Sequence, residues 1–404
     1  MAKKLHLAIP AFNERDFLPQ CITAIEKQDF QNFHIYIAVN QSREYWEKPE
    51  KRAICENNQK TLEYLNSISS DKISVYDLSS KSTAWEEKKS HVGSMRKFLM
   101  DTIKEKAAAD DIILSMDADT YYPENYLSAI HESFTKTKAV ALSIPYYHKL
   151  GDDDNLNRLI LRYEIYMRCY AINLWRISSP YCFSALGSAI ALPLKSYNAI
   201  NGITPKKSGE DFYFLQKLRK YGEILHWTES CAFPAVRYSD RVFFGTGPAL
   251  IKGKNKDWNS YPIYPRAFFE EIAATYTLFP ILFRENTTTP MDAFLEKQFH
   301  GEHIWLKLRK NFIREKDFIR ACHQKIDALR ILQFLKEKYE KNPELHYQNE
   351  ENVVDLLLQY PEELKKQQIS IAAIDFEKNS ISSLQQIRNI LTNIENNYRR
   401  KHSI

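Results

Sequence analysis

Two acidic side chains follow directly on an apolar run. Asp111 to Met116 predicts a buried strand, and Asp117 and Asp119 come immediately after it. Residues two apart in extended chain point to the same side, so the two carboxylates repel each other unless a cation lies beside them. Mg²⁺ or Mn²⁺ held by one or two carboxylates and by substrate phosphate oxygens relieves such repulsion. The pattern therefore predicts a divalent cation at Asp119 and Asp117, although two solvated acids in a turn would give the same sequence.

A second acidic pair opens a predicted helix. Glu210 and Asp211 begin the helical stretch that ends at Tyr221, and Gly209 stands just before them. Acidic residues are favourable at any helix N-terminus, which is the structural alternative. A sharp turn at glycine could instead direct both carboxylates into a cleft, where one of them accepts a proton from an attacking hydroxyl. We expect Asp211 to be this general base and Glu210 to position it or the acceptor.

Three arginines are candidates for binding phosphate. Arg96 lies in a predicted helix, and Arg237 and Arg241 precede the segment Gly245 to Pro248. Arginine pairs with phosphate oxygens, and glycine-rich loops expose backbone N–H groups, so a diphosphate contact is one interpretation. A turn between two elements is the other. No lysine of the Walker type follows, so this segment is not a P-loop.

Alternating strand and helix patterns surround these residues. The predicted strands are Leu5 to Pro10, Phe33 to Asn40, Lys72 to Leu78 and Asp111 to Met116, and the predicted helices between them are Asp16 to Lys27, Lys51 to Ser67 and Ser94 to Lys106. This order predicts an α/β fold with a doubly wound, mostly parallel sheet. Ligands of such sheets bind at the carboxyl ends of the strands, where the candidate residues lie.

The second half of the chain is predicted to be mainly helical. We expect helices at Leu156 to Ile177, Ala267 to Phe283, Ile304 to Glu340, Asn352 to Lys366 and Ser380 to Tyr398. The resulting division is a catalytic domain at 1–255 and a helical C-terminal region at 256–404. The basic end, Arg399 to His402, is expected to be a solvated tail.

Composition excludes several classes of protein. The net charge of +5 is spread along the 404 residues, whereas a nucleic-acid-binding face needs concentrated basic charge. The six cysteines are scattered without a CxxC pair, which argues against a disulfide framework and a zinc site. No signal peptide is evident, and the most apolar long stretch carries Arg162, Glu164, Arg168 and Arg176. We expect a cytoplasmic protein, with peripheral contact to the inner face of a membrane left open.

Taken together, the motifs resemble those of the family 2 glycosyltransferases, which have the GT-A fold. The opening Pro10 to Glu14 (PAFNE) is similar to the family's first motif, and Val39 to Ser42 (VNQS) to its second-strand loop. His91 to Arg96 (HVGSMR) occupies the place of the nucleotide-lining segment. Asp117 to Asp119 matches the metal-binding DxD, Gly187 and Ser188 fall in the acceptor-side segment, and Gly209 to Asp211 matches the family's "GED".

The resemblance implies a metal-dependent, inverting glycosyltransferase of the hexosyltransferase class. Its donor would be a nucleoside-diphosphate sugar and its cofactor Mn²⁺ or Mg²⁺. The residues expected to bind the sugar nucleotide are Pro10, Asn13, Glu14, Asn40, Asp77, Arg96, Asp117 and Arg241. Asn40 and Gln41 replace the usual acids of the second-strand loop, and Asp77 is a candidate substitute, so the base stays open. His226 stands near the place of a histidine that serves some members as a further metal ligand.

Two alternatives belong to other classes. A sugar nucleotidyltransferase also combines such a sheet with acidic metal ligands, but it should carry a glycine-rich, basic N-terminal loop, unlike PAFNERDF. A GT-A-like binding or scaffold protein is the non-catalytic alternative, which the altered second-strand loop favours and the retained acidic pairs oppose. The sequence leaves open the sugar, the acceptor (a glycan or a lipid-linked molecule), the oligomeric state and the role of the helical region.

Overall fold

The computed structural model describes residues 3–301, 303–367 and 373–402, and the chain forms two compact units. The first comprises Met1–Asp152, Phe183–Ile251 and Arg399–Ile404, and the second comprises Asp153–Cys182 and Lys252–Tyr398. This division differs from the predicted boundary at residue 255. Helix α5 (Asp154–Arg176) belongs to the second unit, because its buried Arg168 pairs with Glu164 of the same helix and with Glu395 of α17 (Ile381–Lys401).

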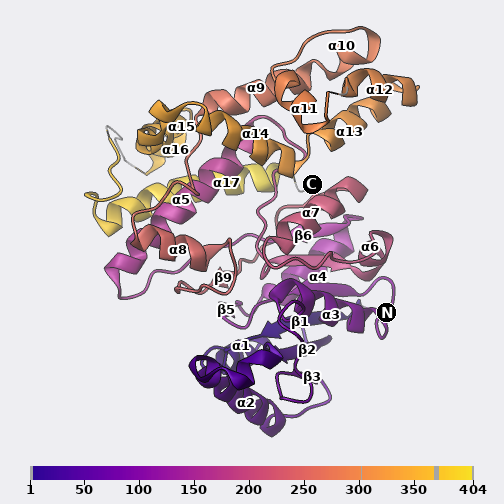
Figure 1. The fold of residues 1–404 in the computed structure, drawn as a ribbon, viewed down its shortest axis with the longest axis vertical. Coiled ribbons are helices and arrows are strands. Elements are labelled where there is room, and N and C mark those ends of the chain that lie inside the picture. Colours follow the sequence, from indigo (N-terminus) through magenta and orange to yellow (C-terminus); the bar gives the residue numbers. More distant parts are fainter. Residues whose placement is uncertain (1–2, 302, 368–372, 403–404) are drawn as a thin grey trace. The chain divides into compact units, whose positions relative to one another are not determined.

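A seven-stranded sheet forms the centre of the first unit (Figure 1). Its strands, in the order β3-β2-β1-β4-β7-β6-β8, are β3 (Ile73–Leu78), β2 (Phe33–Asn40), β1 (Leu5–Ala11), β4 (Ile112–Ser115), β7 (Ile190–Pro193), β6 (Ala141–Ser143) and β8 (Ile224–Leu225). All neighbouring pairs are parallel except those that β7 makes with β4 and β6. The mostly parallel sheet predicted from the sequence is thus present. A separate antiparallel ribbon pairs β5 (Thr120–Tyr121) with β9 (Phe233–Pro234).

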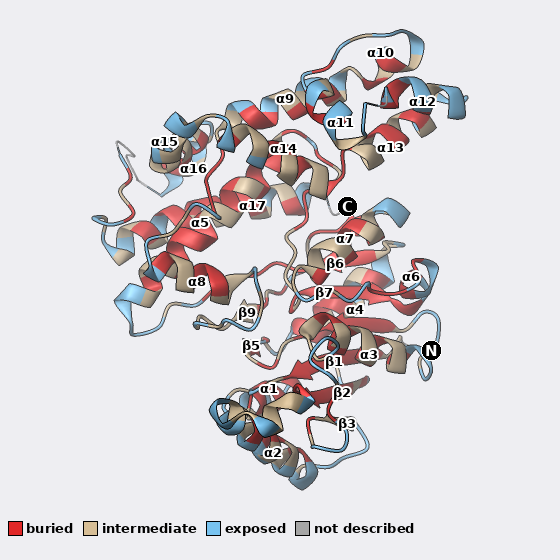
Figure 2. Ribbon diagram, viewed as in Figure 1, coloured by how far each residue is buried: buried red, intermediate tan, exposed pale blue. Residues whose placement is uncertain are grey.

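Apolar side chains on both faces of the central strands explain why this sheet is covered by helices. Every residue of β1 is buried, as is nearly all of β2 (Figure 2). Alternate residues such as Leu7, Ile35 and Leu114 form one core with α1 (Leu18–Glu26) and α4 (Tyr126–Lys136). Helix α3 (Val92–Lys104) contacts β1 and β2 from the other side. Continuous apolar runs are what parallel strands buried on both faces require.

The helices of the first half lie close to their predicted ranges, whereas three of the predicted ranges in the second half are divided into shorter helices. The remaining helices are α2 (Arg52–Ser67), α6 (Leu194–Ala199), α7 (Glu210–Tyr221), α8 (Thr246–Lys254), α9 (Arg266–Thr277), α10 (Phe279–Arg284), α11 (Asp292–Gln298), α12 (Ile304–Asn311), α13 (Glu315–Lys325), α14 (Ala328–Glu340), α15 (Asn349–Leu358) and α16 (Pro361–Lys366). The predicted helix at Ile304 to Glu340 is therefore three helices. Asp327 begins a new one because its side chain accepts from Arg330 N. No described helix has the length and apolar character needed to cross a membrane.

The end of the chain is not the solvated tail that the sequence predicts. Arg399 is only 1% exposed and lies within the first unit. Its guanidinium donates to Ser143 O at the end of β6, to His226 O just after β8 and to Ser184 Oγ. Arg400 stacks on Trp227 at 4.2 Å. A run of basic residues predicts a solvent-exposed segment, but here the Arg399 guanidinium donates hydrogen bonds to buried backbone oxygens.

We expect Arg399→Ala to destabilise the protein by about 2–4 kcal/mol, because hydrogen bonds from a charged group are lost and buried acceptors lose their donor. Urea unfolding followed by far-ultraviolet circular dichroism would show a lower midpoint. The matched control is Lys401→Ala, since Lys401 is exposed two residues further on. Equal midpoints for the two variants would contradict the role given to Arg399.

Candidate functional site

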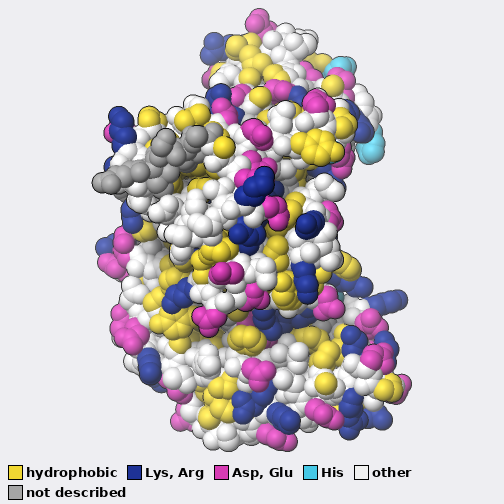
Figure 3. All heavy atoms as spheres, turned by 90° about the vertical axis from the view of Figure 1, so that its left-hand side faces the viewer, with side chains coloured by type: hydrophobic (Ala, Val, Ile, Leu, Met, Phe, Trp, Pro, Cys, Tyr) yellow, Lys and Arg dark blue, Asp and Glu magenta, His cyan; other side chains and the backbone are white. Residues whose placement is uncertain are grey.

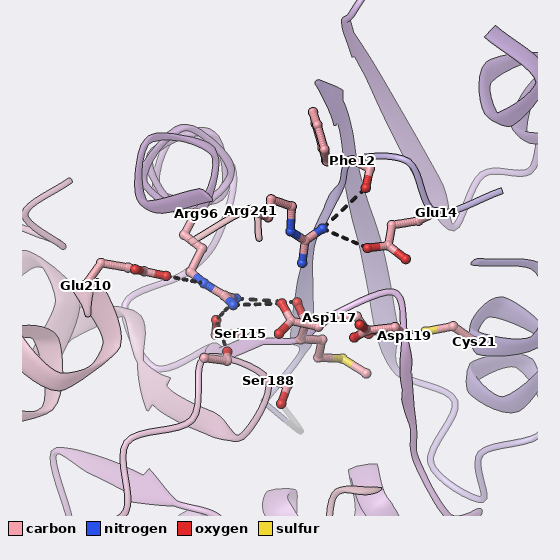
Figure 4. A network of polar contacts seen from close by, with 12 residues as sticks. Phe12, Glu14, Cys21, Arg96, Ser115, Asp117, Asp119, Ser188, Glu210 and Arg241 are labelled. Carbon is pink, nitrogen blue, oxygen red and sulfur yellow. Dashed lines mark hydrogen bonds and ion pairs between the residues drawn. The ribbon is translucent and has the colours of Figure 1, made fainter. Parts of the chain in front are cut away.

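The two aspartates lie at the carboxyl end of β4, as predicted. Asp117 and Asp119 follow the strand after Met116, and both side chains are partly exposed, at 27% and 17%. Arg96 of α3 contacts the first of them, with Nη2 2.7 Å from Asp117 Oδ1 (Figure 4). Arg237 contacts the second, with Nη2 2.6 Å from Asp119 Oδ2. Each carboxylate of the motif is therefore paired with a guanidinium.

Arg96 is a buried cation that links three elements. Its Nε donates to Glu210 Oε1 of α7 at 3.1 Å, and its Nη1 donates to Ser115 Oγ of β4 at 2.7 Å. Ser115 in turn donates to Gly187 O. Burial alone would lower the pKa of Arg96, but Asp117 and Glu210 raise it above its ordinary value, so the charge is retained. All three guanidinium nitrogens are engaged by the protein, which makes Arg96 a link between the two acidic motifs.

Gly187 leaves room for this guanidinium. A Cβ at Gly187 would lie 2.2 Å from Arg96 Nη2 and 2.7 Å from its Cζ. We expect Gly187→Ala to displace Arg96 from Asp117 and Glu210 and to destabilise the protein by about 1–3 kcal/mol, the range for overpacking. Donor binding should weaken as well, which nucleotide titration would show. Gly151→Ala is the matched control, because no atom lies within 4 Å of a Cβ added there.

The third acid of the cluster comes from the loop after β1. Glu14 is only 2% exposed, and its Oε1 accepts from Arg237 Nη2 at 2.5 Å and from Arg241 Nη1 at 2.8 Å. Its Oε2 is buried without a hydrogen-bond partner among the described residues. Burial and nearby Asp119 raise the pKa of Glu14 to about 7, against the opposite effect of Arg241 and Arg237. Glu14 therefore holds both arginines beside Asp119.

The second acidic pair starts α7, as predicted. Gly209 has φ +73°, in the left-handed region that favours glycine, and it turns the chain into the helix. Glu210 is buried against Arg96. Burial, then the charge of Glu210, raise the pKa of Asp211 to about 7, while Arg96 pulls it down. A carboxyl with this pKa can take up a proton near neutral pH.

The charge balance of this cluster bears on metal binding. Its ionisable members are Glu14, Arg96, Asp117, Asp119, Glu210, Asp211, Arg237 and Arg241. Five carboxyl groups thus face three guanidiniums. Burial is the largest cause of the raised pKa values of Glu14 and Asp211, and the neighbouring carboxylates of Asp119 and Glu210 add to it. Among the described residues, no group of three or more His, Cys, Asp or Glu side chains could hold a metal ion. The arrangement fits a divalent cation bound by one or two aspartates and completed by substrate phosphates.

The residues expected to read the nucleotide lie along the same sheet edge but outside this cluster. Asn40, at the end of β2, donates to Ser90 O, and Asn13 has φ +59° with its N–H on Asn58 Oδ1. Pro10 is part of β1 and buried. Asp77, at the end of β3, accepts from Ser79 and Ser80 N–H groups; burial would raise its pKa, but these hydrogen bonds lower it. Asp77 therefore shapes a turn at this edge.

Comparison with known proteins gives distant structural similarities. Among solved structures, the chain is similar to TarS 1–349 of S. aureus, at 11% sequence identity and a TM-score of 0.39, with 98% of this chain and 92% of that chain covered. A complex of TarS 1–349 with UDP-GlcNAc gives 12% identity, a TM-score of 0.40 and coverage of 99% and 92%. The mannosyltransferase PcManGT from Pyrobaculum calidifontis, in complex with GDP-Man and Mn²⁺, gives 11%, 0.39, 81% and 88%. No protein-family model and no curated protein matches the sequence. A function for this chain must therefore come from its own residues.

Two features of the site go beyond what the sequence indicated. Arg237 bridges Glu14 and Asp119, whereas the spacing of Arg237 and Arg241, four residues apart, indicates no such partner. Arg96 is enclosed by protein groups, although the sequence suggested a diphosphate contact. Burial and, to a smaller extent, the charge of Arg399 lower the pKa of His226. His226 takes no part in the described contacts of the acidic cluster.

The face of the molecule in Figure 3 has no broad basic area among its described residues. On the face in Figure 3, Lys and Arg side chains are interspersed with Asp and Glu. Such a surface lacks the single-sign stripe that tracks a nucleic-acid backbone.

Proposed function

We propose that this chain is a glycosyltransferase, which moves a sugar from a nucleoside-diphosphate sugar to an acceptor hydroxyl with inversion at the anomeric carbon. The observation that carries the proposal is the junction of two acidic motifs through one buried cation. Arg96 contacts Asp117 at the end of β4 and Glu210 at the start of α7. Phosphate-binding groups and a carboxyl able to accept a proton near pH 7 are thereby held together.

The donor side consists of Asp119 and the two partly exposed arginines. Arg237 and Arg241 each present several N–H donors, of which Glu14 and Asp119 engage only some. The remaining donors suit the oxygens of a diphosphate. A divalent cation held by Asp119 and Asp117 would supply Lewis-acid stabilisation of the charge that develops on the departing diphosphate. The residues that contact the nucleotide base would be Asn13 in the loop after β1, Asn40 at the end of β2 and Asp77 at the end of β3.

Asp211 is the proposed general base. As the acceptor oxygen forms its bond to the anomeric carbon, the bond from that carbon to the diphosphate oxygen breaks with its electron pair, and the hydroxyl proton passes to Asp211. Burial, which keeps the pKa of Asp211 near 7, makes it a stronger base than an ordinary aspartate. Glu210 stays ion-paired with Arg96 and fixes the start of α7. The Cys21 thiol, whose Sγ lies 3.8 Å from Asp117 O, is excluded as a nucleophile because burial and nearby Asp119 raise its pKa.

A thermal-shift panel of UDP-, GDP- and dTDP-sugars, with and without Mn²⁺, tests the proposal and identifies the base. We expect one nucleotide to raise the melting temperature and Mn²⁺ to increase the effect. The Mn²⁺-dependent affinity should be higher at pH 8 than at pH 6, because nearby Glu14 and Asp211, whose pKa values are raised to about 7, carry the negative charge that attracts the cation only when deprotonated. Absence of any nucleotide binding would favour the scaffold alternative.

A further inference from the structure

A pair of aromatic rings stands on the surface of the first unit beside the proposed catalytic cluster. Tyr121 of β5 and Phe233 of β9 lie directly opposite each other, with ring centroids 6.0 Å apart. Tyr121 is 49% exposed, although it is a large aromatic side chain. The Lys149 Nζ lies 4.4 Å from both ring centroids. Among the described contacts, Lys149 has no acidic partner.

The ribbon that carries these rings also carries two members of the cluster. Asp119 comes two residues before Tyr121, and Arg237 comes four residues after Phe233. Ala235 N donates to Asp119 O, which continues the ladder by one residue beyond the paired strands. Thr120 between them is buried, whereas Asp119 and Tyr121 both reach solvent. Asp119, which is ion-paired with Arg237, and Tyr121 of the aromatic pair thus lie on the same side of the ribbon, about 7 Å apart along the chain.

The position of the ribbon favours an acceptor over a donor. The residues expected to read the base lie at the ends of β1, β2 and β3, whereas β5 follows β4, on the other side of β1 in the sheet order. A donor bound across the sheet edge would place its nucleoside at the ends of β1, β2 and β3 and its diphosphate at the acidic cluster around Asp119. The aromatic pair then lies beyond the diphosphate, where the attacking molecule must approach.

We propose that Tyr121, Phe233 and Lys149 form a saccharide-binding subsite for the acceptor, a proposal that rests on the proposed function. Sugar rings have an apolar C–H face and a polar edge. Aromatic rings provide large, rigid apolar area for the C–H face. The Lys149 ammonium, with three donors and no acidic partner among the described contacts, donates to the oxygen atoms at the edge. Tyr147, whose ring meets Phe233 edge-on at 6.4 Å, extends the same surface.

The test measures saccharide binding separately from donor binding. Fluorescently labelled protein is applied to an array of defined neutral and anionic mono- to tetrasaccharides, in the presence of Mn²⁺ and of whichever of UDP, GDP or dTDP matches the base identified by the thermal-shift panel. Wild-type protein should bind a subset, and Tyr121→Ala and Phe233→Ala should each weaken this binding about tenfold or more, from the loss of aromatic contact. Lys149→Gln should weaken it as well. Nucleotide-induced thermal shifts should be unchanged in all three variants.

Tyr221→Ala is the matched control, because Tyr221 is 54% exposed at the far end of α7. Its saccharide binding should equal that of wild-type protein. The proposal is overturned if wild-type protein binds no saccharide, or if Tyr121→Ala and Phe233→Ala bind as wild type does. Failure of the proposed function is distinguishable, because it would appear as the absence of any nucleotide thermal shift. Unchanged binding by Lys149→Gln alone would remove that residue from the subsite.

Discussion

Asp211→Asn is expected to lower the rate of glycosyl transfer by about 10²–10⁴-fold, the contribution of a general base, while leaving donor affinity largely intact. The asparagine keeps the size of the side chain and its place at the start of α7 but cannot take up the acceptor proton. Steady-state kinetics with the donor found by thermal shift would give kcat, and calorimetric titration would give the donor Kd. Near-normal turnover would remove Asp211 from this role.

The pH profile separates a base from a merely structural carboxylate. Asp211 must be deprotonated to act, and burial raises its pKa to about 7. In wild-type protein, kcat/KM should therefore rise about tenfold per pH unit below pH 7 and level off above it. Asp211→Asn should lose this rise. Asp152→Asn, a change at an exposed aspartate of the same unit, should leave both the rate and the profile as in wild type.

Asp119→Asn is expected to remove metal-dependent donor binding and to lower kcat/KM by at least about 100-fold. The loss of a Lewis acid costs several kcal/mol of transition-state stabilisation, and each 1.4 kcal/mol is about a factor of ten. Calorimetric titration of nucleoside diphosphate with and without Mn²⁺ would show the affinity gained from Mn²⁺ in wild type and its absence in the variant.

Asp117→Asn provides the comparison, because Asp117 is paired with buried Arg96 whereas Asp119 is paired with partly exposed Arg237. Replacement of Asp117 by asparagine leaves buried Arg96 with less negative charge around it. The melting temperature of Asp117→Asn should therefore fall further than that of Asp119→Asn. The opposite order of stabilities, or an Asp119→Asn variant that retains the full effect of Mn²⁺ on nucleotide binding, would show that the two aspartates have been given the wrong roles.

Local sequence signals located most of the first unit and its acidic residues. The strand at Phe33–Asn40 and the helix at Glu210–Tyr221 occur within the predicted bounds. Apolar runs and helical periodicity act over a few residues, so a sequence shows them directly. In the second unit, the apolar pattern predicts fewer and longer helices than the structure has. Pro361 begins a new helix there, and so does the N-cap at Asp327, although the apolar periodicity runs on through both positions.

Sequence by itself determined the acidic pairs that define the candidate site, Asp117 with Asp119 and Glu210 with Asp211, and their places at a strand end and a helix start. Tertiary structure decided which cation meets which acid. Arg96 reaches Glu210 across 114 positions, and Arg237 reaches Glu14 across 223. Long-range pairs depend on how the strands are ordered and packed, which no local pattern encodes. The burial of Arg399 cannot be predicted locally for the same reason, since its acceptors, Ser143 O in β6 and His226 O just after β8, are far away in the sequence.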